Sequence, residues 1–172
     1  MKSKITFLLT LFWMMGINRS IGQSHHSLII NEIMADPSPV VQLPLYEWVE
    51  IKNNSKELIQ LLGWKLVAGN SVSSPFPSYF LSPDSLLIVC SSSAAILLKN
   101  YGSTIGLSSF PALNNEGETL SLRAPNGKTI HAVTYSQTWY GVSWKQEGGW
   151  SLELIDKNAA CWAADNWTAS VD

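Results

Sequence analysis

Short apolar runs, separated by turn residues, follow one another along most of the chain. They are rich in β-branched and aromatic side chains and are bounded by Gly, Pro, Asn and Ser, which is typical of β-strands. The pattern predicts strands over residues 28–35, 46–53, 58–61, 64–68, 86–90, 119–123, 130–135 and 150–155. About eight strands with turn signals between them favour a β-sandwich or a β-barrel.

Turn and cap residues indicate where these strands end and where a helix begins. Pro37 and Pro39 end the first run, because proline cannot donate to a strand ladder. The pair Asn126-Gly127 indicates a hairpin, since both residues readily adopt positive φ. Residues 94–101 form the one stretch with helical character, and the serines at 91–93 can cap it. The chain is therefore expected to be all-β with one short helix.

The first segment has the pattern of a secretory signal peptide. Lys2 and Lys4 precede an almost wholly apolar run over residues 5–17, which is too short to cross a bilayer comfortably. Small residues at Ser20 and Gly22 fit a cleavage site before Gln23. We therefore expect a signal peptide over 1–22, a short N-terminal tail over 23–27 and one domain over 28–172. A retained N-terminal anchor is the alternative.

Export places the domain outside the cytoplasm, where a disulfide can form. The chain has two cysteines, Cys90 and Cys161. They either pair with each other, or Cys90 is a buried thiol in a strand and Cys161 lies in a loop. Their wide separation does not fit a metal-ligand pattern. The net charge of −2 and the absence of a basic run argue against nucleic acid as a partner.

Six segments, in this order, resemble the lamin-tail domain family in its secreted bacterial form, and together they cover nearly all of the expected mature chain. They are Ile29 to Pro37 (IINEIMADP), Glu47 to Asn53 (EWVEIKN), Leu62 to Leu66 (LGWKL), Phe80 to Leu86 (FLSPDSL), Leu113 to Leu122 (LNNEGETLSL) and Gly149 to Leu154 (GWSLEL).

The resemblance implies an immunoglobulin-like β-sandwich and no reaction, because the domain is known as an interaction and targeting module. Bacterial copies are often attached to secreted nucleases, to other hydrolases or to large surface proteins. Two alternatives follow for this chain, which either acts alone or is a fragment of a multidomain protein. Function does not follow from the fold by itself.

Catalytic signatures are absent from the sequence. It contains neither a Gly-x-Ser-x-Gly elbow nor a Gly-rich phosphate loop ending in Lys-Ser/Thr. His25 and His26 fall in the expected tail. His131 lies in a predicted strand, where a hydrogen-bonded or half-exposed structural histidine is favoured over a catalytic base. We expect no enzyme activity, no cofactor and no catalytic residue.

Four carboxylates near the first two strands raise the question of calcium. Calcium takes carboxylate oxygens, and Glu32, Asp36, Glu47 and Glu50 lie on strands that are candidates to be neighbours. Strand alternation, however, puts Glu47 and Glu50 on opposite faces, so the four do not converge without a bulge. Pairing with lysines or loop backbone is the simpler interpretation, and no metal site is assigned.

Aromatic residues crowd the segment before the last predicted strand. Trp150 opens a strand motif and is expected in the core, as are Trp48 and Trp64. Trp139, Tyr140 and Trp144 fall in a predicted loop and are the candidate ligand surface, because exposed Tyr and Trp anchor protein interfaces and stack on sugar rings. The sequence thus predicts a non-catalytic interaction module, secreted or at the cell surface, that binds protein or extracellular polysaccharide. The alternative is a targeting or accessory domain of a larger secreted hydrolase or nuclease.

Overall fold

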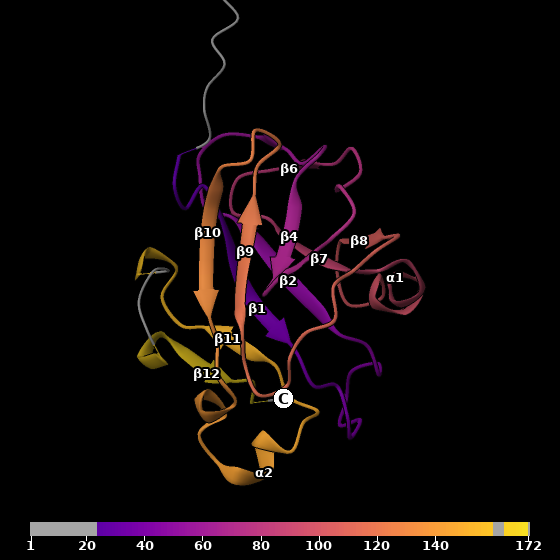
Figure 1. Cartoon of the computed structure of the whole chain (residues 1–172), viewed down its shortest axis with the longest axis vertical. Helices are drawn as coiled ribbons and strands as arrows, with labels where there is room; N and C mark the ends of the chain where they lie inside the picture. Colours follow the sequence, from indigo (N-terminus) through magenta and orange to yellow (C-terminus); the bar gives the residue numbers. More distant parts are fainter. Residues whose placement is uncertain (1–23, 160–163, 172) are drawn as a thin grey trace, which may run out of the picture.

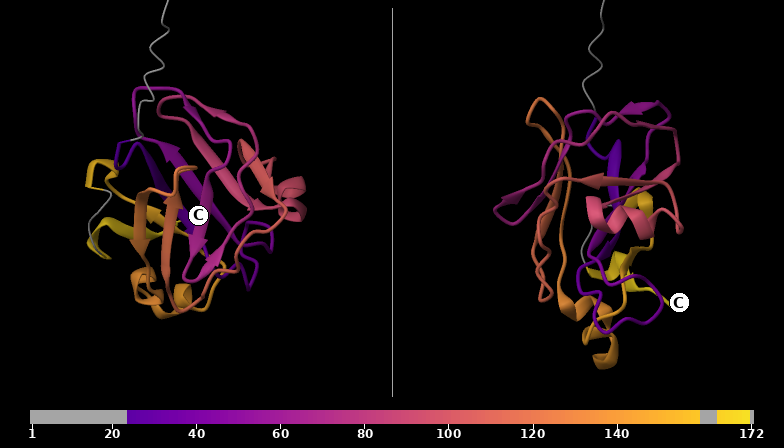
Figure 2. Two further views of the ribbon diagram at one scale, coloured as in Figure 1. Left: turned by 45° about the horizontal axis from the view of Figure 1, so that its top comes forward. Right: turned by 90° about the vertical axis from the view of Figure 1, so that its right-hand side faces the viewer.

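A computed structural model shows two β-sheets packed face to face, and it describes residues 24–159 and 164–171 (Figure 1). The larger sheet has six strands in the order β12-β11-β1-β2-β7-β8, and the smaller has four in the order β10-β9-β4-β5. A further two-stranded sheet joins β3 and β6. The right-hand view of Figure 2 shows the layers edge-on, with β9 and β10 in one and β1 in the other.

The strands are β1 (Leu28–Met34), β2 (Trp48–Asn53), β3 (Ile59–Gln60), β4 (Lys65–Ala68), β5 (Ser71–Val72), β6 (Phe80–Leu81), β7 (Leu86–Ser91), β8 (Thr104–Leu107), β9 (Thr119–Arg123), β10 (Thr129–Thr134), β11 (Leu152–Leu154) and β12 (Trp167–Ala169). The helices are α1 (Ser92–Leu98) and α2 (Ser143–Gln146), with 3-10 turns η1 (Gln137–Tyr140), η2 (Lys157–Ala159) and η3 (Ala164–Asn166).

The core lies between the two sheets and is built by strand alternation. On β2, Val49 and Ile51 are fully buried and face the smaller sheet, where Leu120 and Leu122 of β9 meet them within one apolar cluster. The intervening residue Glu50 points to the other face and is only partly buried. Each fully buried aliphatic side chain contributes roughly 1.5–3 kcal/mol, so this cluster supplies the main driving force for folding.

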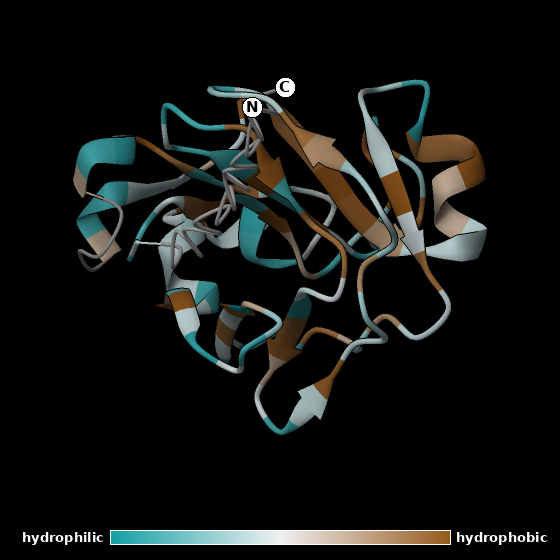
Figure 3. Cartoon of the chain, turned by 90° about the horizontal axis from the view of Figure 1, so that it is seen from above, coloured by the Kyte–Doolittle hydropathy of each residue, from teal (hydrophilic) through white to brown (hydrophobic). Residues whose placement is uncertain are grey.

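The outer face of the six-stranded sheet has a second, smaller apolar cluster. The helix α1 connects β7 to β8, which pair in parallel, whereas the other strand pairs are antiparallel. Ser91 caps this helix, since its side chain accepts from the Ala94 N–H at 3.2 Å. The helix covers buried residues of β1, β2 and β7 and brings its own Ala94 and Leu98 to them. Figure 3 shows α1 at the right-hand edge, coloured largely as hydrophobic.

Strand β1 lies where the two sheets meet. Its pairing with β11 is confined to Glu32 and Ile33, and its register against β2 shifts between Ile30 and Glu32. On the N-terminal side of that register shift, the Ile30 N–H donates to Nδ1 of the buried His131 on β10, at 3.2 Å. The His26 N–H donates to the carbonyl of Ile130 on the same strand at 3.0 Å. The His131 side chain therefore satisfies the Ile30 N–H on β1, and the β10 backbone binds the chain just before this strand.

The fold class predicted from the sequence, an immunoglobulin-like β-sandwich, is confirmed. Strands are present in all eight predicted runs, and His131 is the hydrogen-bonded strand histidine that was expected. The helix occupies Ser92–Leu98 instead of 94–101, because the Ser91 cap starts it earlier. Strands β5, β6, β8 and β12 were not predicted as separate strands. The signal-peptide prediction, which covers residues 1–22, lies outside the described residues.

We expect His131→Ala to destabilise the domain. The substitution leaves the Ile30 N–H buried without its acceptor and removes a fully packed ring, which together cost about 2–4 kcal/mol. Urea denaturation should show a lower midpoint with an unchanged slope. His25→Ala is the matched control, because His25 is exposed and its loss should change stability by less than about 0.5 kcal/mol. Equal midpoints for the two variants would contradict the assigned role of His131.

Candidate functional site

The segment after β10 is folded into two short helical turns at one end of the sandwich (Figure 1). The 3-10 turn η1 starts at Ser136, whose side chain accepts from the Thr138 N–H, and it ends at Gly141, which has φ 75°. The helix α2 follows at once. The predicted loop is therefore ordered, and its aromatic side chains have fixed directions.

Trp144 on α2 is the exposed member of this segment, with 55% of its surface accessible. Its ring meets the ring of Trp150 edge-to-face, with centroids 5.1 Å apart and planes at 80°. The Lys145 ammonium lies 4.3 Å from the Trp150 centroid and 5.3 Å from the Trp144 centroid, and it also donates to the Ser170 carbonyl. We call Trp144, Lys145 and Trp150 the Trp144 platform. A rigid aromatic pair beside a cation can stack on a flat ligand and hydrogen-bond to it.

A glycine pair holds the platform in place. Gly148 and Gly149 have φ of 103° and 82°, which side chains rarely adopt. A Cβ on Gly148 would stand 2.0 Å from the Ser38 carbonyl oxygen, so only glycine permits this approach of the loop before β2. The Gly149 N–H donates to the Asp36 carbonyl at 2.8 Å and completes the contact. Trp150 follows directly and is thereby fixed against the sandwich.

The other two residues of the predicted ligand surface differ from expectation. Tyr140 is only 6% exposed, and among the described residues its hydroxyl has no hydrogen-bond partner. Its expected exposure is wrong, because η1 turns this ring into the core. Trp139 is half-buried and packs on Trp167 with ring centroids 6.1 Å apart.

Trp64 is buried between the sheets as predicted. Trp48 is buried as well, but on the outer face of the larger sheet beneath α1, because strand alternation points Val49 and Ile51 inward. Trp150 is half-buried at the border of the core and not inside it.

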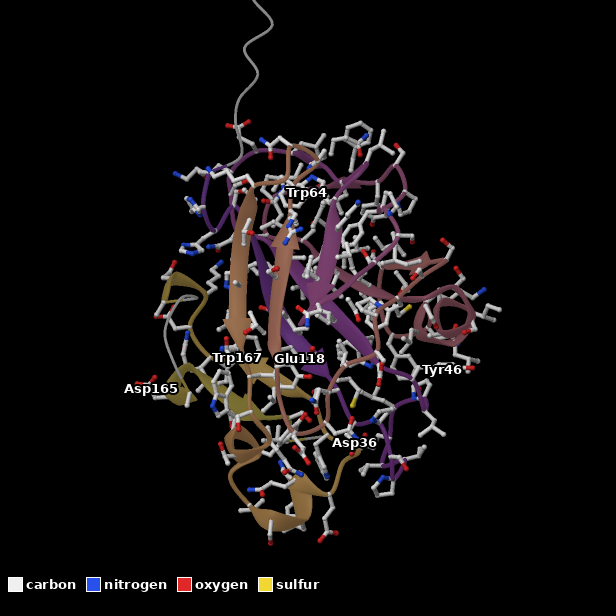
Figure 4. All side chains as sticks on the ribbon, viewed as in Figure 1. Asp36, Tyr46, Trp64, Glu118, Asp165 and Trp167 are labelled. Atoms are coloured by element: carbon white, nitrogen blue, oxygen red, sulfur yellow. The ribbon has the colours of Figure 1, made fainter. Side chains whose placement is uncertain are left out.

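The four carboxylates considered for calcium lie in two separate pairs. Glu32 and Glu50 face each other across β1 and β2 on the outer face of the larger sheet, and both line a hollow of about 160 Å³. Glu47 lies just before β2, accepts from the Leu113 N–H at 3.1 Å and lines a different hollow of about 370 Å³. The Asp36 carboxylate acts on Glu47 through its charge, and Figure 4 labels it in the lower part of the molecule, above the segment that contains α2. Within residues 24–159 and 164–171 there is no group of three His, Cys, Asp or Glu suited to a metal ion.

Burial dominates the electrostatics of these carboxylates. It raises the pKa of Glu32 to about 7, although the Ser151 hydroxyl donates to this carboxylate at 2.5 Å and opposes the shift. It also raises the pKa of Glu50, against a hydrogen bond from the Asn31 amide at 2.9 Å. The pKa of Glu47 is raised for the same reason. Sequence reasoning identified these residues but did not reveal that Glu32 would be partly buried and its pKa raised.

Cys90 is a buried free thiol on β7, and its burial raises its pKa to about 11. It donates to the Ile105 carbonyl at 3.7 Å. This matches the interpretation of Cys90 as a small core residue. Cys161 lies outside the described residues.

None of the described helices is long and apolar enough to cross a membrane. A model of the lamin tail domain family matches residues 22–137, which is more than half of the chain. No curated protein matches the sequence.

We expect the stability of the domain to depend on the titration of Glu32. The folded state binds this proton more tightly than the unfolded chain, since its pKa rises from 4.5 to about 7. The resulting stabilisation is fully present below about pH 4.5 and is lost as the pH rises through 7. Between pH 5 and pH 8 the free energy of unfolding should fall by on the order of 1–3 kcal/mol.

Urea denaturation of wild type and Glu32→Gln across this range tests the assignment. Glutamine keeps an oxygen for the Ser151 hydroxyl but does not titrate, so its profile should be flatter and its stability at pH 8 higher. Glu116→Gln removes the same charge at an exposed position and should keep the wild-type slope. Parallel profiles for wild type and Glu32→Gln would show that Glu32 titrates normally.

Proposed function

Because this chain belongs to the lamin tail domain family, we propose that it is a non-catalytic interaction module that binds protein or glycan. The domain type itself is a non-catalytic immunoglobulin-like one, and the proposal extends that character to the whole protein. We also propose that the protein is bacterial and is exported by its N-terminal segment to the cell surface or beyond. The N-terminal segment supports this localisation, because Lys2 and Lys4 precede an apolar run as in a signal peptide.

The binding proposal rests on one observation: Trp144 is exposed, and its ring is held by contacts with Trp150 and Lys145. A tryptophan side chain exposed to this extent gains nothing from core packing, yet here its ring is oriented by Trp150 and Lys145. Such preorganised aromatic side chains lose little conformational entropy on binding. Val142 and Val171 are also exposed near the two chain segments that form the platform. The platform therefore has the composition of a binding hot spot.

The chemistry of the platform favours a ligand with both flat apolar faces and polar edges. Sugar rings offer C–H faces to an aromatic ring and hydroxyls to a neighbouring ammonium, and exposed tryptophan is suited to both. A protein loop with an aromatic or carboxylate side chain would use the same groups. If the domain serves as the targeting part of a larger secreted hydrolase or nuclease, the same surface would bring that enzyme to its substrate.

We expect Trp144→Ala to weaken ligand binding at least about tenfold while the fold is kept, because an exposed aromatic anchor contributes roughly 1–3 kcal/mol. The measurement is a tryptophan-fluorescence titration of the protein against a panel of polysaccharides, with duplex DNA and calcium chloride as comparison ligands. A saturable shift with one polysaccharide is the expected result.

Phe80→Ala is the matched control, because Phe80 is 61% exposed on β6 and is outside the platform. It should bind as wild type does. A polysaccharide whose binding is equally strong in Trp144→Ala would place the site elsewhere. A flat response to every polysaccharide would exclude glycan and leave a protein partner for this surface.

A further inference from the structure

The outer face of the larger sheet carries a hollow that the Trp144 platform does not use. It has a volume of about 160 Å³ and is lined by Glu32, Trp48, Glu50, Ile88, Leu98 and Tyr101. Glu32, Glu50 and Ile88 lie side by side on β1, β2 and β7, because Glu50 is opposite Glu32 on one side and Ile88 on the other. Leu98 comes from α1, and Tyr101 comes from the turn that follows it.

In each of the two carboxylates, one oxygen accepts a hydrogen bond and the other, among the described residues, does not. Oε1 of Glu32 accepts from the Ser151 hydroxyl, and Oε1 of Glu50 accepts from the Asn31 amide. In the described part of the chain, no hydrogen bond reaches Oε2 of either residue, and the ion pairs there all involve Asp84. Each carboxylate therefore keeps one free oxygen and forms no ion pair among these residues. The Lys52 ammonium lowers the pKa of Glu50 through its charge, but it forms its ion pair with Asp84, at 3.7 Å.

Their arrangement is unfavourable in the absence of a cation. Like charges directly opposite on neighbouring strands destabilise a sheet, and Glu153 on β11 extends the row, since it is opposite Glu32 on the other side. Partial burial adds a desolvation cost to each charge. A cation placed between Glu32 and Glu50 would reverse both effects.

The rest of the hollow is apolar and aromatic. Ile88 and Leu98 provide aliphatic walls. Trp48 is only 4% exposed, and its indole N–H is buried without a hydrogen-bond partner among the described residues. Tyr101 is largely exposed. A hydrated metal ion does not suit such walls, whereas a cation on a hydrocarbon stem does.

We propose that this hollow binds a primary alkylammonium group, supplied either by a lysine side chain of a partner protein or by a free alkylamine. The ammonium has three donors and reaches the free oxygens of Glu32 and Glu50 with charge-assisted hydrogen bonds. Its methylene stem lies along Ile88 and Leu98, and the Trp48 ring adds a cation–π contribution. The hollow, at about 160 Å³, is smaller than a typical small-molecule pocket and therefore suits a single alkyl chain.

Isothermal titration of the protein at pH 8, where Glu32 is ionised, tests the site. The probes are n-pentylamine, its neutral analogue 1-pentanol, Nα-acetyl-lysine methylamide and calcium chloride. Pentylamine and the lysine derivative should bind saturably, whereas pentanol should not. The ratio of their affinities distinguishes the two sources, because tighter binding of the lysine derivative indicates a protein side chain and tighter binding of pentylamine indicates a free amine.

Variants of the two glutamates test whether pentylamine binds in this hollow. Glu50→Gln and Glu32→Gln keep their hydrogen-bonded oxygens and should each weaken pentylamine at least tenfold. Glu116→Gln is exposed and outside the hollow, so it should bind as wild type does and control for net charge. In the NMR spectrum, the indole N–H signal that is lost in Trp48→Phe should shift on saturation with pentylamine.

Three outcomes would overturn the proposal: equal binding of pentanol and pentylamine, equal loss in Glu116→Gln, or calcium binding that depends on Glu32 and Glu50 without any binding of the amines. Trp144→Ala should leave pentylamine binding intact. Failure of this site is therefore separable from failure of the Trp144 platform.

Discussion

The fold depends on how the hydrogen bonds of β1 are satisfied. This strand is paired with β2 along its length except at the register shift between Ile30 and Glu32, but β11 reaches only two of its residues on the other side. In the N-terminal part of β1, His131 of β10 accepts from the Ile30 N–H, and the Ile130 carbonyl accepts from His26 just before the strand. Because an unpaired buried N–H costs about 1–3 kcal/mol, this closure stabilises the packing of β10 against β1.

The closure also explains where functional groups can lie. Since β10 and β11 both complete β1, the chain between them must leave the sandwich at one end and return, and η1, α2 and the glycine pair form that excursion. Its buried members, Tyr140 and half-buried Trp139, attach it to the core. Trp144 is at the outer side of the excursion and has no role in closing the sheets, so selection for stability does not account for its exposure.

Much of the fold could be predicted from the sequence, because apolar runs such as residues 28–35 are bounded by turn residues such as Pro37. Strand β8 could not, since its four residues form a strand only through parallel pairing with β7 beyond the intervening helix. For the site, the aromatic segment and the carboxylates were identified from composition. The burial of Tyr140 and of Glu32 was not, because the direction of a side chain in a 3-10 turn, or the covering of a sheet face by a distant helix, depends on tertiary packing.

Side chains of β2 alternate between the core and the outer face, so this one strand contributes both to stability and to the proposed binding site. Val49 and Ile51 point inward and complete the core, so Trp48 and Glu50 must point to the outer face. The helix α1 covers Trp48 but stops short of enclosing Glu50, which leaves a space with apolar walls and a charged floor. A sheet selected only for stability would place a lysine opposite one of these glutamates. The chain instead places glutamates on three adjacent strands, β2, β1 and β11, and the proposed alkylammonium group supplies a cation that balances this row.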